Sequence, residues 1–215
     1  MIVGLIGFIG AGKGSVADIL VSNHSFIKES FANSVKDAVS VIFGWDRTLL
    51  EGDTPESRAW REQPDEFWST KFGRSFTPRE ALQKMGTEVG RDIFHENFWV
   101  DRLEKYINSD ENYVITDCRF FNEINFIHRM GGITIEIQRG VKPHWYDIAR
   151  KANQGDVKAI NFMHNQSGVH SSEWSWIGGE IDHVIDNNKD MDELKNNLIK
   201  KLASSFGSSI IGELK

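Results

Sequence analysis

The most constraining feature of the sequence is a glycine-rich loop between a short apolar run and a helical pattern. The apolar run Ile2–Ile6 predicts a buried strand, and the glycines follow it directly. Gly7, Gly12 and Lys13 fit the spacing G-x-x-x-x-G-K. Ser15 follows one residue later than the usual hydroxyl. Glycines turn backbone N–H groups toward an anion. The motif predicts a phosphate-binding loop, and the alternative is a glycine turn with an exposed lysine.

The rest of the chain alternates between apolar strand patterns and amphipathic helix patterns. Strands are expected over 113–117, 133–139 and 181–186, and helices over 35–43, 97–107, 122–130 and 190–202. Two further helices should begin after Thr54 and Thr77, because each is followed by a proline suited to the first turn. At Thr77, Glu80 would complete a capping box. This rhythm predicts an α/β fold, a three-layer parallel sheet with helices on both faces.

The length of 215 residues suits a single domain, and one stretch interrupts its rhythm. Residues 140–178 are long, weakly periodic and rich in tryptophan and histidine, which favours a lid insertion over plain disorder. Residues 139–170 contain five basic and two acidic side chains, which suits a lid that closes over polyphosphate. A chance fluctuation of surface charge is the alternative. The region 44–107 is expected to be helical and to bind a second substrate.

Composition argues against several other classes of protein. The chain carries 25 Lys and Arg against 31 Asp and Glu, a net charge of −6, whereas nucleic-acid-binding domains usually have a basic excess. No apolar run approaches the ~20 residues of a membrane span. The N-terminus lacks a signal-peptide pattern, and the single Cys118 permits no disulfide framework. We therefore expect a cytoplasmic globular protein without nucleic-acid or membrane partners, with most of its phenylalanines in the core.

Phosphate-binding loops occur in GTPases, motor ATPases and small-molecule kinases, and other segments discriminate among these classes. A GTPase needs an Asn-Lys-x-Asp base reader, whereas residues 188–191 are Asn-Lys-Asp-Met. A motor ATPase usually has a strand that ends in Asp-Glu. The corresponding strand here ends in Asp117, followed by Cys118 and Arg119. The sequence thus favours a small-molecule kinase.

A kinase whose acceptor is itself a phosphate must hold two polyanions, and arginine binds phosphate oxygens in a bidentate manner. Arg79 and Gln83 lie one turn apart on an expected helix, so both can face one ligand. Asp117 and Arg119 follow an expected strand, where ligands of open α/β sheets collect. The structural alternatives are a solvated charge for Arg79 and an ion pair for Asp117 and Arg119. The spacing of Trp99 alone is more typical of a core residue than of a base-stacking one.

Several segments together resemble the bacteriophage deoxynucleoside monophosphate kinases, a branch of the P-loop nucleoside monophosphate kinase fold. The resembling segments are the loop at 7–15, FANSVKDA at 31–38, REALQKMGTEVGRDIFHENFWVDRL at 79–103, YVITDCRFFNEINFIHRMGGITIEIQR at 113–139 and HSSE…IDNN at 170–188. They span most of the chain, whereas 44–76 and 140–169 match poorly. The resemblance implies transfer of the ATP γ-phosphate to a deoxynucleoside monophosphate (dNMP) with Mg²⁺, in a homodimer.

The resemblance also implies roles for individual residues, position by position. Those implied to bind ATP are Gly10, Gly12, Lys13, Gly14 and Ser15, with Ser15 at Mg²⁺ and Asn187 near the base. Those implied to line the deoxynucleotide pocket are Arg58, Arg79, Gln83, Gly86, Thr87 and Trp99, while Asp117, Arg119 and Glu123 would lie beside the phosphates. The implied catalytic residues are Lys13, Arg79, Asp117 and Arg119. Ile9, Gly10 and Gly14 stand where the family has charged residues, which leaves Arg119 and lid arginines to supply charge.

Three alternatives stay open from the sequence. The first is a kinase of another small phosphorylated metabolite, because animal-type phosphomevalonate kinases resemble this family in the loop and in the Asp-x-Arg strand. The second is a non-catalytic nucleotide-binding regulator, which would bind ATP without transferring phosphate. The third, a nucleic-acid-binding accessory protein, is disfavoured by the net charge of −6.

Overall fold

The chain is divided into two compact units in the computed structural model, which describes residues 1–166 and 168–207. The sheet unit comprises residues 1–29 together with the chain from residue 108 onward, and the helical unit is Ser30–Ile107. Residue 167, which falls inside the expected lid, and residues 208–215 lie outside the described residues. Each unit is described by itself.

The sheet unit contains a five-stranded parallel sheet. Its strands are β1 (Ile2–Ile6), β2 (Phe26–Glu29), β3 (Asn112–Ile115), β4 (Ile133–Gln138) and β5 (His183–Asp186), in the order β2-β3-β1-β4-β5. Every neighbouring pair is parallel, with Val3 beside Val114 on one side and Ile133 on the other. The predicted α/β fold with a parallel sheet is confirmed. Strand β2 was not predicted, because two of its four side chains are exposed and its apolar pattern is weak.

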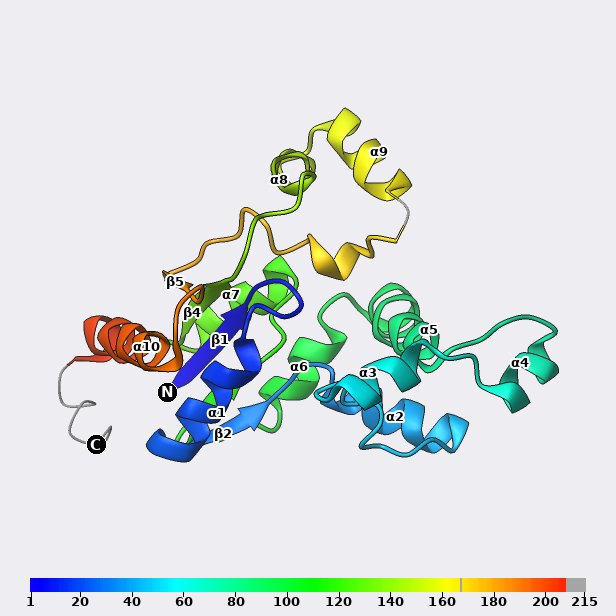
Figure 1. Ribbon diagram of the computed structural model, residues 1–215, viewed down its shortest axis with the longest axis horizontal. Coiled ribbons are helices and arrows are strands. Elements are labelled where there is room, and N and C mark those ends of the chain that lie inside the picture. The colour runs from blue at the N-terminus through cyan, green and yellow to red at the C-terminus, as the bar shows by residue number, and fades with distance from the viewer. Residues whose placement is uncertain (167, 208–215) are drawn as a thin grey trace. The chain divides into compact units, whose positions relative to one another are not determined.

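Helices cover both faces of this sheet (Figure 1). They are α1 (Lys13–His24), α7 (Phe121–Arg129) and α10 (Met191–Phe206). Leu5 packs in one buried cluster with Leu20 of α1 and Leu198 of α10. Gly4 faces the opposite way, and a Cβ there would meet Ile127 of α7. Each fully buried leucine or isoleucine of this kind stabilises the fold by about 1.5–3 kcal/mol.

The order of the strands creates a switch point between β1 and β3. These strands are neighbours, yet the chain leaves β1 for α1 on one face and leaves β3 for α7 on the other. In open α/β sheets, ligands bind at the carboxyl ends of such strands, where the two connections diverge. The glycine loop after β1 and residues 117–119 after β3 both lie at this point, because Cys118 N donates to Leu5 O at 3.3 Å.

The segment expected to be a lid contains regular helices. They are α8 (Tyr146–Asn153), α9 (Val157–Asn165) and the short 3₁₀ helix η2 (Ser171–Glu173), and α8 packs against α9 (Figure 1). Helix α8 was not predicted, because it has only eight residues and its buried side chains, Ala149 and Ala152, are small. Asp156 caps α9 by accepting from the backbone N–H of Lys158 and of Ala159.

The helical unit is built from short helices. They are α2 (Asn33–Phe43), α3 (Pro55–Glu62), α4 (Glu66–Phe72), α5 (Pro78–Gln83), the π-helix η1 (Lys84–Phe94) and α6 (Phe98–Glu104). Thr54 and Thr77 cap α3 and α5, as predicted, by accepting from backbone N–H groups. The Glu80 side chain differs from the prediction, because its carboxylate binds Arg74 at 2.7 and 2.8 Å instead of completing the capping box.

Aromatic side chains form a second packing centre in the helical unit. Phe43 stacks on Trp45 at 4.7 Å between ring centroids and meets Phe76 at 5.4 Å. Trp68 donates its indole N–H to the Phe43 carbonyl at 3.0 Å. The expectation that most phenylalanines fill the core is wrong: in the described residues, only Phe26, Phe31, Phe76 and Phe126 are buried. Among the described helices, none combines the length and apolar character of a membrane span.

Candidate active site

The glycine loop adopts backbone conformations that only glycine accepts easily. Gly7, Gly10 and Gly12 have φ values of 139°, 80° and 104°. The loop closes with a hydrogen bond from Ala11 N to Phe8 O at 3.1 Å. A Cβ on Gly7 would collide with the carbonyl oxygen of Ile137 in β4. The loop is therefore fixed in shape against the sheet, with α1 beginning immediately after it.

Asn187 supports the loop from the end of β5. Its side-chain amide donates to Ala11 O at 2.8 Å, and its backbone N–H donates to Gln138 O at 2.8 Å. The same amide occupies the space that a Cβ on Gly12 would need. The structure thus places Asn187 against the phosphate loop.

Lys13 folds back over the loop that carries it. Its ammonium donates to Gly7 O at 2.6 Å and to Phe8 O at 3.1 Å. Removal from water lowers the pKa of Lys13 from 10.5 to about 8, because burial penalises the charged form. A polyanionic ligand beside Lys13 would favour the charged form and raise this pKa again.

Charged side chains from the end of β3 and from η2 shift the pKa of Lys13. Arg119 lowers the Lys13 pKa by repulsion, whereas Glu173 and Asp117 raise it. Arg119 Nη1 donates to a Glu173 carboxylate oxygen at 2.7 Å. The structure therefore brings together three residues predicted from the sequence, Lys13, Asp117 and Arg119, and adds Glu173, to which the sequence assigned no role.

Glu123 fixes the backbone between β3 and α7. Its carboxylate accepts from the backbone N–H of Arg119 at 2.6 Å and of Phe120 at 3.1 Å. The residue is only 2% exposed. Glu123 is the third residue of α7, and a carboxylate there that accepts from the N-cap N–H is one half of a capping box. Glu123 thus holds the backbone of Arg119 in place.

An aromatic cluster joins the loop to the expected lid. Phe8 meets Trp145 at 5.7 Å, Tyr146 at 6.2 Å and Trp176 at 5.2 Å between ring centroids, all edge to face. Such pairs contribute about 0.5–1.5 kcal/mol beyond the area they bury. No spacing signal pointed to this cluster, since Phe8, Trp145 and Trp176 are far apart along the chain. The abundance of tryptophan in 140–178 was the one hint.

The two arginines predicted in the helical unit are engaged with nearby groups. Arg58 donates to Gly52 O at 2.9 Å and to Asp53 O at 2.8 Å. Arg79 forms an ion pair with Glu62 of α3. A phosphate ligand would therefore replace existing partners. Gln83 ends α5 one turn after Arg79, as the predicted helix requires.

Trp99 lies against a π-helix that the sequence did not predict. Its indole N–H donates to Gly86 O at 2.8 Å, and its ring fills the space beside Gly90, where a Cβ would collide with it. Trp99 is 6% exposed, in agreement with the core position that its spacing suggested. Thr87 follows Gly86 in η1, and π-helical turns occur frequently at functional sites.

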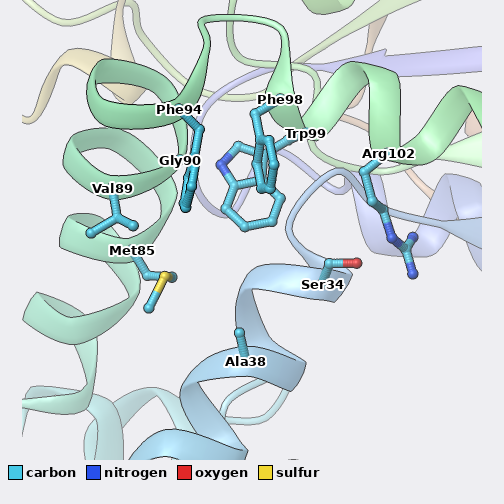
Figure 2. A pocket seen from close by; sticks show the side chains of 9 residues that line it. All are labelled: Ser34, Ala38, Met85, Val89, Gly90, Phe94, Phe98, Trp99 and Arg102. Atoms are coloured by element: carbon cyan, nitrogen blue, oxygen red, sulfur yellow. The ribbon is translucent and has the colours of Figure 1, made fainter.

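A pocket of about 310 Å³ opens beside Trp99 in the helical unit. Its lining is contributed by α2, η1 and α6: Ser34, Ala38, Met85, Val89, Gly90, Phe94, Phe98, Trp99 and Arg102. Figure 2 shows the Phe94, Phe98 and Trp99 rings gathered at one end of it, and neighbouring rings lie 4.8–5.0 Å apart. Of these residues only Trp99 was predicted as a site residue. Arg102, which lies over the Tyr106 ring at 4.4 Å, had no signal in the sequence.

The residues present fit a nucleotide with Mg²⁺. Within the described residues, no group of three or more His, Cys, Asp or Glu side chains could hold a metal by itself. Mg²⁺ usually keeps several waters and takes substrate phosphates with one or two protein oxygens. Ser15, in the first turn of α1, offers one such hydroxyl beside the glycine cradle.

No family model matches the chain. A protein of Acanthamoeba polyphaga mimivirus, named a deoxynucleotide monophosphate kinase, is 32% identical over 152 residues, which are 65% of this chain and 74% of the mimivirus protein. The deoxynucleoside-5'-monophosphate kinase of Escherichia phage T5 is 49% identical over 49 residues, which are 22% of this chain and 20% of the phage protein.

Two solved kinase structures align with nearly the whole chain. Shikimate kinase from Bacteroides thetaiotaomicron aligns over 95% of this chain and 97% of its own, with a TM-score of 0.40 and 13% identity. Dephospho-CoA kinase from Campylobacter jejuni aligns over 96% and 98%, with a TM-score of 0.42 and 14% identity. Family membership follows from the sequence relatives, since the mimivirus protein is 32% identical and is covered over 74% of its length. The chain belongs to the deoxynucleotide monophosphate kinase family.

Proposed function

We propose that this chain transfers the γ-phosphate of ATP to a dNMP, giving ADP and a deoxynucleoside diphosphate. The observation that carries the proposal is the position of Lys13: it lies in a glycine cradle at the β1/β3 switch point, close enough to Arg119 for their charges to interact. A desolvated lysine and an arginine on neighbouring strand ends suit a polyphosphate better than any neutral ligand. Membership of a dNMP kinase family agrees with this chemistry.

In this proposal the sheet unit binds ATP. Gly10, Gly12 and Gly14 supply the cradle, Lys13 meets the β- and γ-phosphates, and Ser15 takes Mg²⁺. The ion, when bound, neutralises phosphate charge. Asn187 holds the loop from behind through Ala11 and lies toward the ATP base.

The acceptor belongs to the helical unit and to the end of β3. The proposed acceptor residues are Arg58, Arg79, Gln83, Gly86, Thr87 and Trp99, with Asp117, Arg119 and Glu123 at the phosphates. Arg79 would bind the acceptor phosphate in exchange for Glu62, and Arg119 would bind the transferring phosphate. Both units then act as one kinase domain. The acceptor region is 44–107 and the lid is 140–178.

The proposed step needs no general base. A phosphate monoester has a second pKa of about 6, so the attacking oxygen is already mostly deprotonated at pH 7. Catalysis is then alignment and charge neutralisation by Lys13, Arg79 and Arg119, with Asp117 tuning their charge. The basic lid excludes water, which would otherwise accept the phosphate. We also propose a homodimer that acts in the host cytoplasm.

The decisive experiment measures ADP release with ATP and Mg²⁺ in the presence of each dNMP, each ribonucleoside monophosphate and phosphomevalonate. We expect stimulation by at least one dNMP. Stimulation by phosphomevalonate alone would instead support a metabolite kinase. ATP binding without transfer to any acceptor would support a nucleotide-binding regulator. Size-exclusion chromatography with light scattering tests the dimer.

A further inference from the structure

Glu173 occupies a position that the proposed mechanism does not yet use. It is the last residue of η2, and its carboxylate accepts from Arg119 Nη1 at 2.7 Å. The Ser172 hydroxyl lies 3.5 Å from the same nitrogen. The Glu173 side chain is 22% exposed and that of Arg119 is 34% exposed. The pair thus lies at the edge of the site, open on one side to a ligand.

The backbone that carries Glu173 is held by several independent contacts. Trp176 donates its indole N–H to Glu173 O at 3.0 Å, and its ring packs on Phe8 of the phosphate loop. Asn153 of α8 donates to Trp174 O at 2.9 Å and to Ile177 O at 2.8 Å. Trp176 is only 2% exposed. The turn is therefore fixed to α8 by hydrogen bonds and to the phosphate loop by ring packing.

Arg119 is held at two ends, and part of its guanidinium is left for a ligand. Glu123 accepts from its backbone N–H, and Glu173 accepts from Nη1. In the part of the chain that the structure describes, Nε and Nη2 of Arg119 have no hydrogen-bond partner. A guanidinium carries five N–H donors in one plane. A carboxylate bound at Nη1 therefore fixes the plane and leaves the Nε and Nη2 donors for a ligand.

The charges explain why a carboxylate is needed there. Lys13 and Arg119 repel each other, which lowers the Lys13 pKa. Two carboxylates raise this pKa again, and Glu173 has a larger effect than Asp117. Without Glu173, two cations would face each other before any phosphate arrives. A partly exposed ion pair contributes at most about 1 kcal/mol to stability. The position of Glu173 is thus poorly explained by stability alone.

We propose that Glu173 is a positioning residue for phosphoryl transfer, whose carboxylate aims the Arg119 guanidinium at the transferring phosphate from a turn anchored on the phosphate loop. The inference rests on the proposed kinase function and deepens it. Glu173 touches no substrate itself, because it acts through Arg119. The η2 turn thereby supports catalysis as well as belonging to the lid segment 140–178.

The test uses the full chain with Glu173→Gln, which keeps the shape and removes the charge. We expect kcat to fall by ~10- to 100-fold with KM for ATP and dNMP within about threefold, because misaimed groups act mainly on the transition state. The alkaline limb of the pH profile should move to lower pH, since Lys13 loses a neighbour that favours its charge. Glu180→Gln, an exposed glutamate seven positions later, is the matched control and should match the wild type.

A second set of variants separates aiming from a merely structural role. In an Arg119→Ala background, Glu173→Gln should change kcat by less than about twofold, because the two residues act as one unit. The proposal would be overturned if the losses of kcat in the two single variants multiplied in the double variant. It would also be overturned by a folded Glu173→Gln enzyme with wild-type kcat. If the wild type phosphorylates no dNMP, the kinase function fails. In that case, the affinity for a non-hydrolysable ATP analogue is measured against pH in the wild type and in Glu173→Gln. If the affinity falls at the same alkaline pH in both proteins, the role of Glu173 is refuted.

Discussion

The phosphate loop and the acceptor candidates of the helical unit hold their functional groups in different ways. Around the loop, Lys13 is bound by backbone carbonyls, and Asn187 and Glu123 hold the backbone itself. In the helical unit, Arg79 is paired with the carboxylate of Glu62, and Arg58 with loop carbonyls. The proposed donor site is thus preorganised by main-chain geometry, whereas the proposed acceptor site depends on side chains that would have to exchange partners.

The largest effect is expected from Lys13→Ala. Loss of the single buried cation in the glycine cradle should lower kcat by roughly 10³-fold, in the range seen when one transition-state contact is removed. The fold should persist, because the lysine is held only by its own loop. Steady-state ADP release and circular dichroism check both points. Lys158→Ala, an exposed lysine of α9, is the control, and near wild-type turnover in Lys13→Ala would exclude the phosphate-loop assignment.

Gly12→Ala tests whether main-chain geometry governs the donor site. A Cβ at φ 104° would strain the backbone and collide with the Asn187 amide. We expect a loss of at least about 1 kcal/mol of stability together with weaker ATP binding. Gly14→Ala serves as the stability control, because a Cβ there meets open space. Denaturant unfolding of both variants decides, and equal stability would show that the cradle is softer than its dihedral angles indicate.

Arg79→Ala tests the acceptor side. We expect the KM for dNMP to rise by about 10-fold, the cost of one charge-assisted phosphate contact, while KM for ATP stays within about twofold. Stability should change little, since the Arg79–Glu62 pair is partly exposed. Arg74→Ala, which removes a neighbouring arginine paired with Glu80, is the matched control. A rise in KM for ATP instead would place Arg79 on the donor side.

The pH dependence of ATP binding should follow Lys13. Its pKa of about 8 lies below the ordinary 10.5, so the ammonium is charged below pH 8 and loses its proton as the pH rises through that value. Because polyphosphate needs the charged form, KM for ATP should rise about 10-fold between pH 7 and pH 9. The phosphates, with a second pKa of about 6, are already mostly ionised at pH 7 and contribute little to this change. A Lys13→Arg variant, which stays charged, should lose the dependence even if its activity is low.

The smallest effect concerns the stability of the sheet unit in acid. His24 at the end of α1 is buried with no hydrogen-bond partner for either ring nitrogen among the described residues. Burial lowers its pKa from 6.5, so unfolding takes up a proton and stability is lost as the pH falls below about 6.5. His24→Leu should reduce the fall in Tm between pH 7 and pH 5 by about 2 °C. An unchanged fall would show that other groups govern the acid sensitivity.

The predictable part of the fold follows from large apolar side chains at regular spacing. Strand β1 is buried along its whole length and was predicted with its exact bounds, and α7 and α10 differ from prediction only at their ends. Strand β2 was not predicted because an edge strand with exposed side chains carries little periodic signal. Helix α8 was not predicted because it has only eight residues and its buried side chains are alanines. The π-helix η1 was hidden because the pattern of α5 runs into it without a break.

The candidate site divides along the same line. Lys13 and its glycines were visible because the motif is contiguous and its chemistry is local. Asp117 and Arg119 were visible because they follow a strand. Glu173 was assigned no role because its partner lies 54 positions away in the chain. Helical spacing indicated Arg79 and Gln83, the resemblance implied the full set of acceptor residues, and the spacing of Trp99 alone indicated a core position.

The sequence by itself determined the phosphate loop, the parallel α/β architecture and the family, because spaced glycines, a lysine directly after them and buried strands each leave a local pattern. Only the tertiary structure decided that Glu173 holds Arg119, that Phe8 packs on Trp176 and that Asn187 fixes Gly12 in place. These contacts join segments far apart in the chain. No spacing rule encodes them, since sheet order and helix packing alone bring such residues within hydrogen-bonding and van der Waals distance.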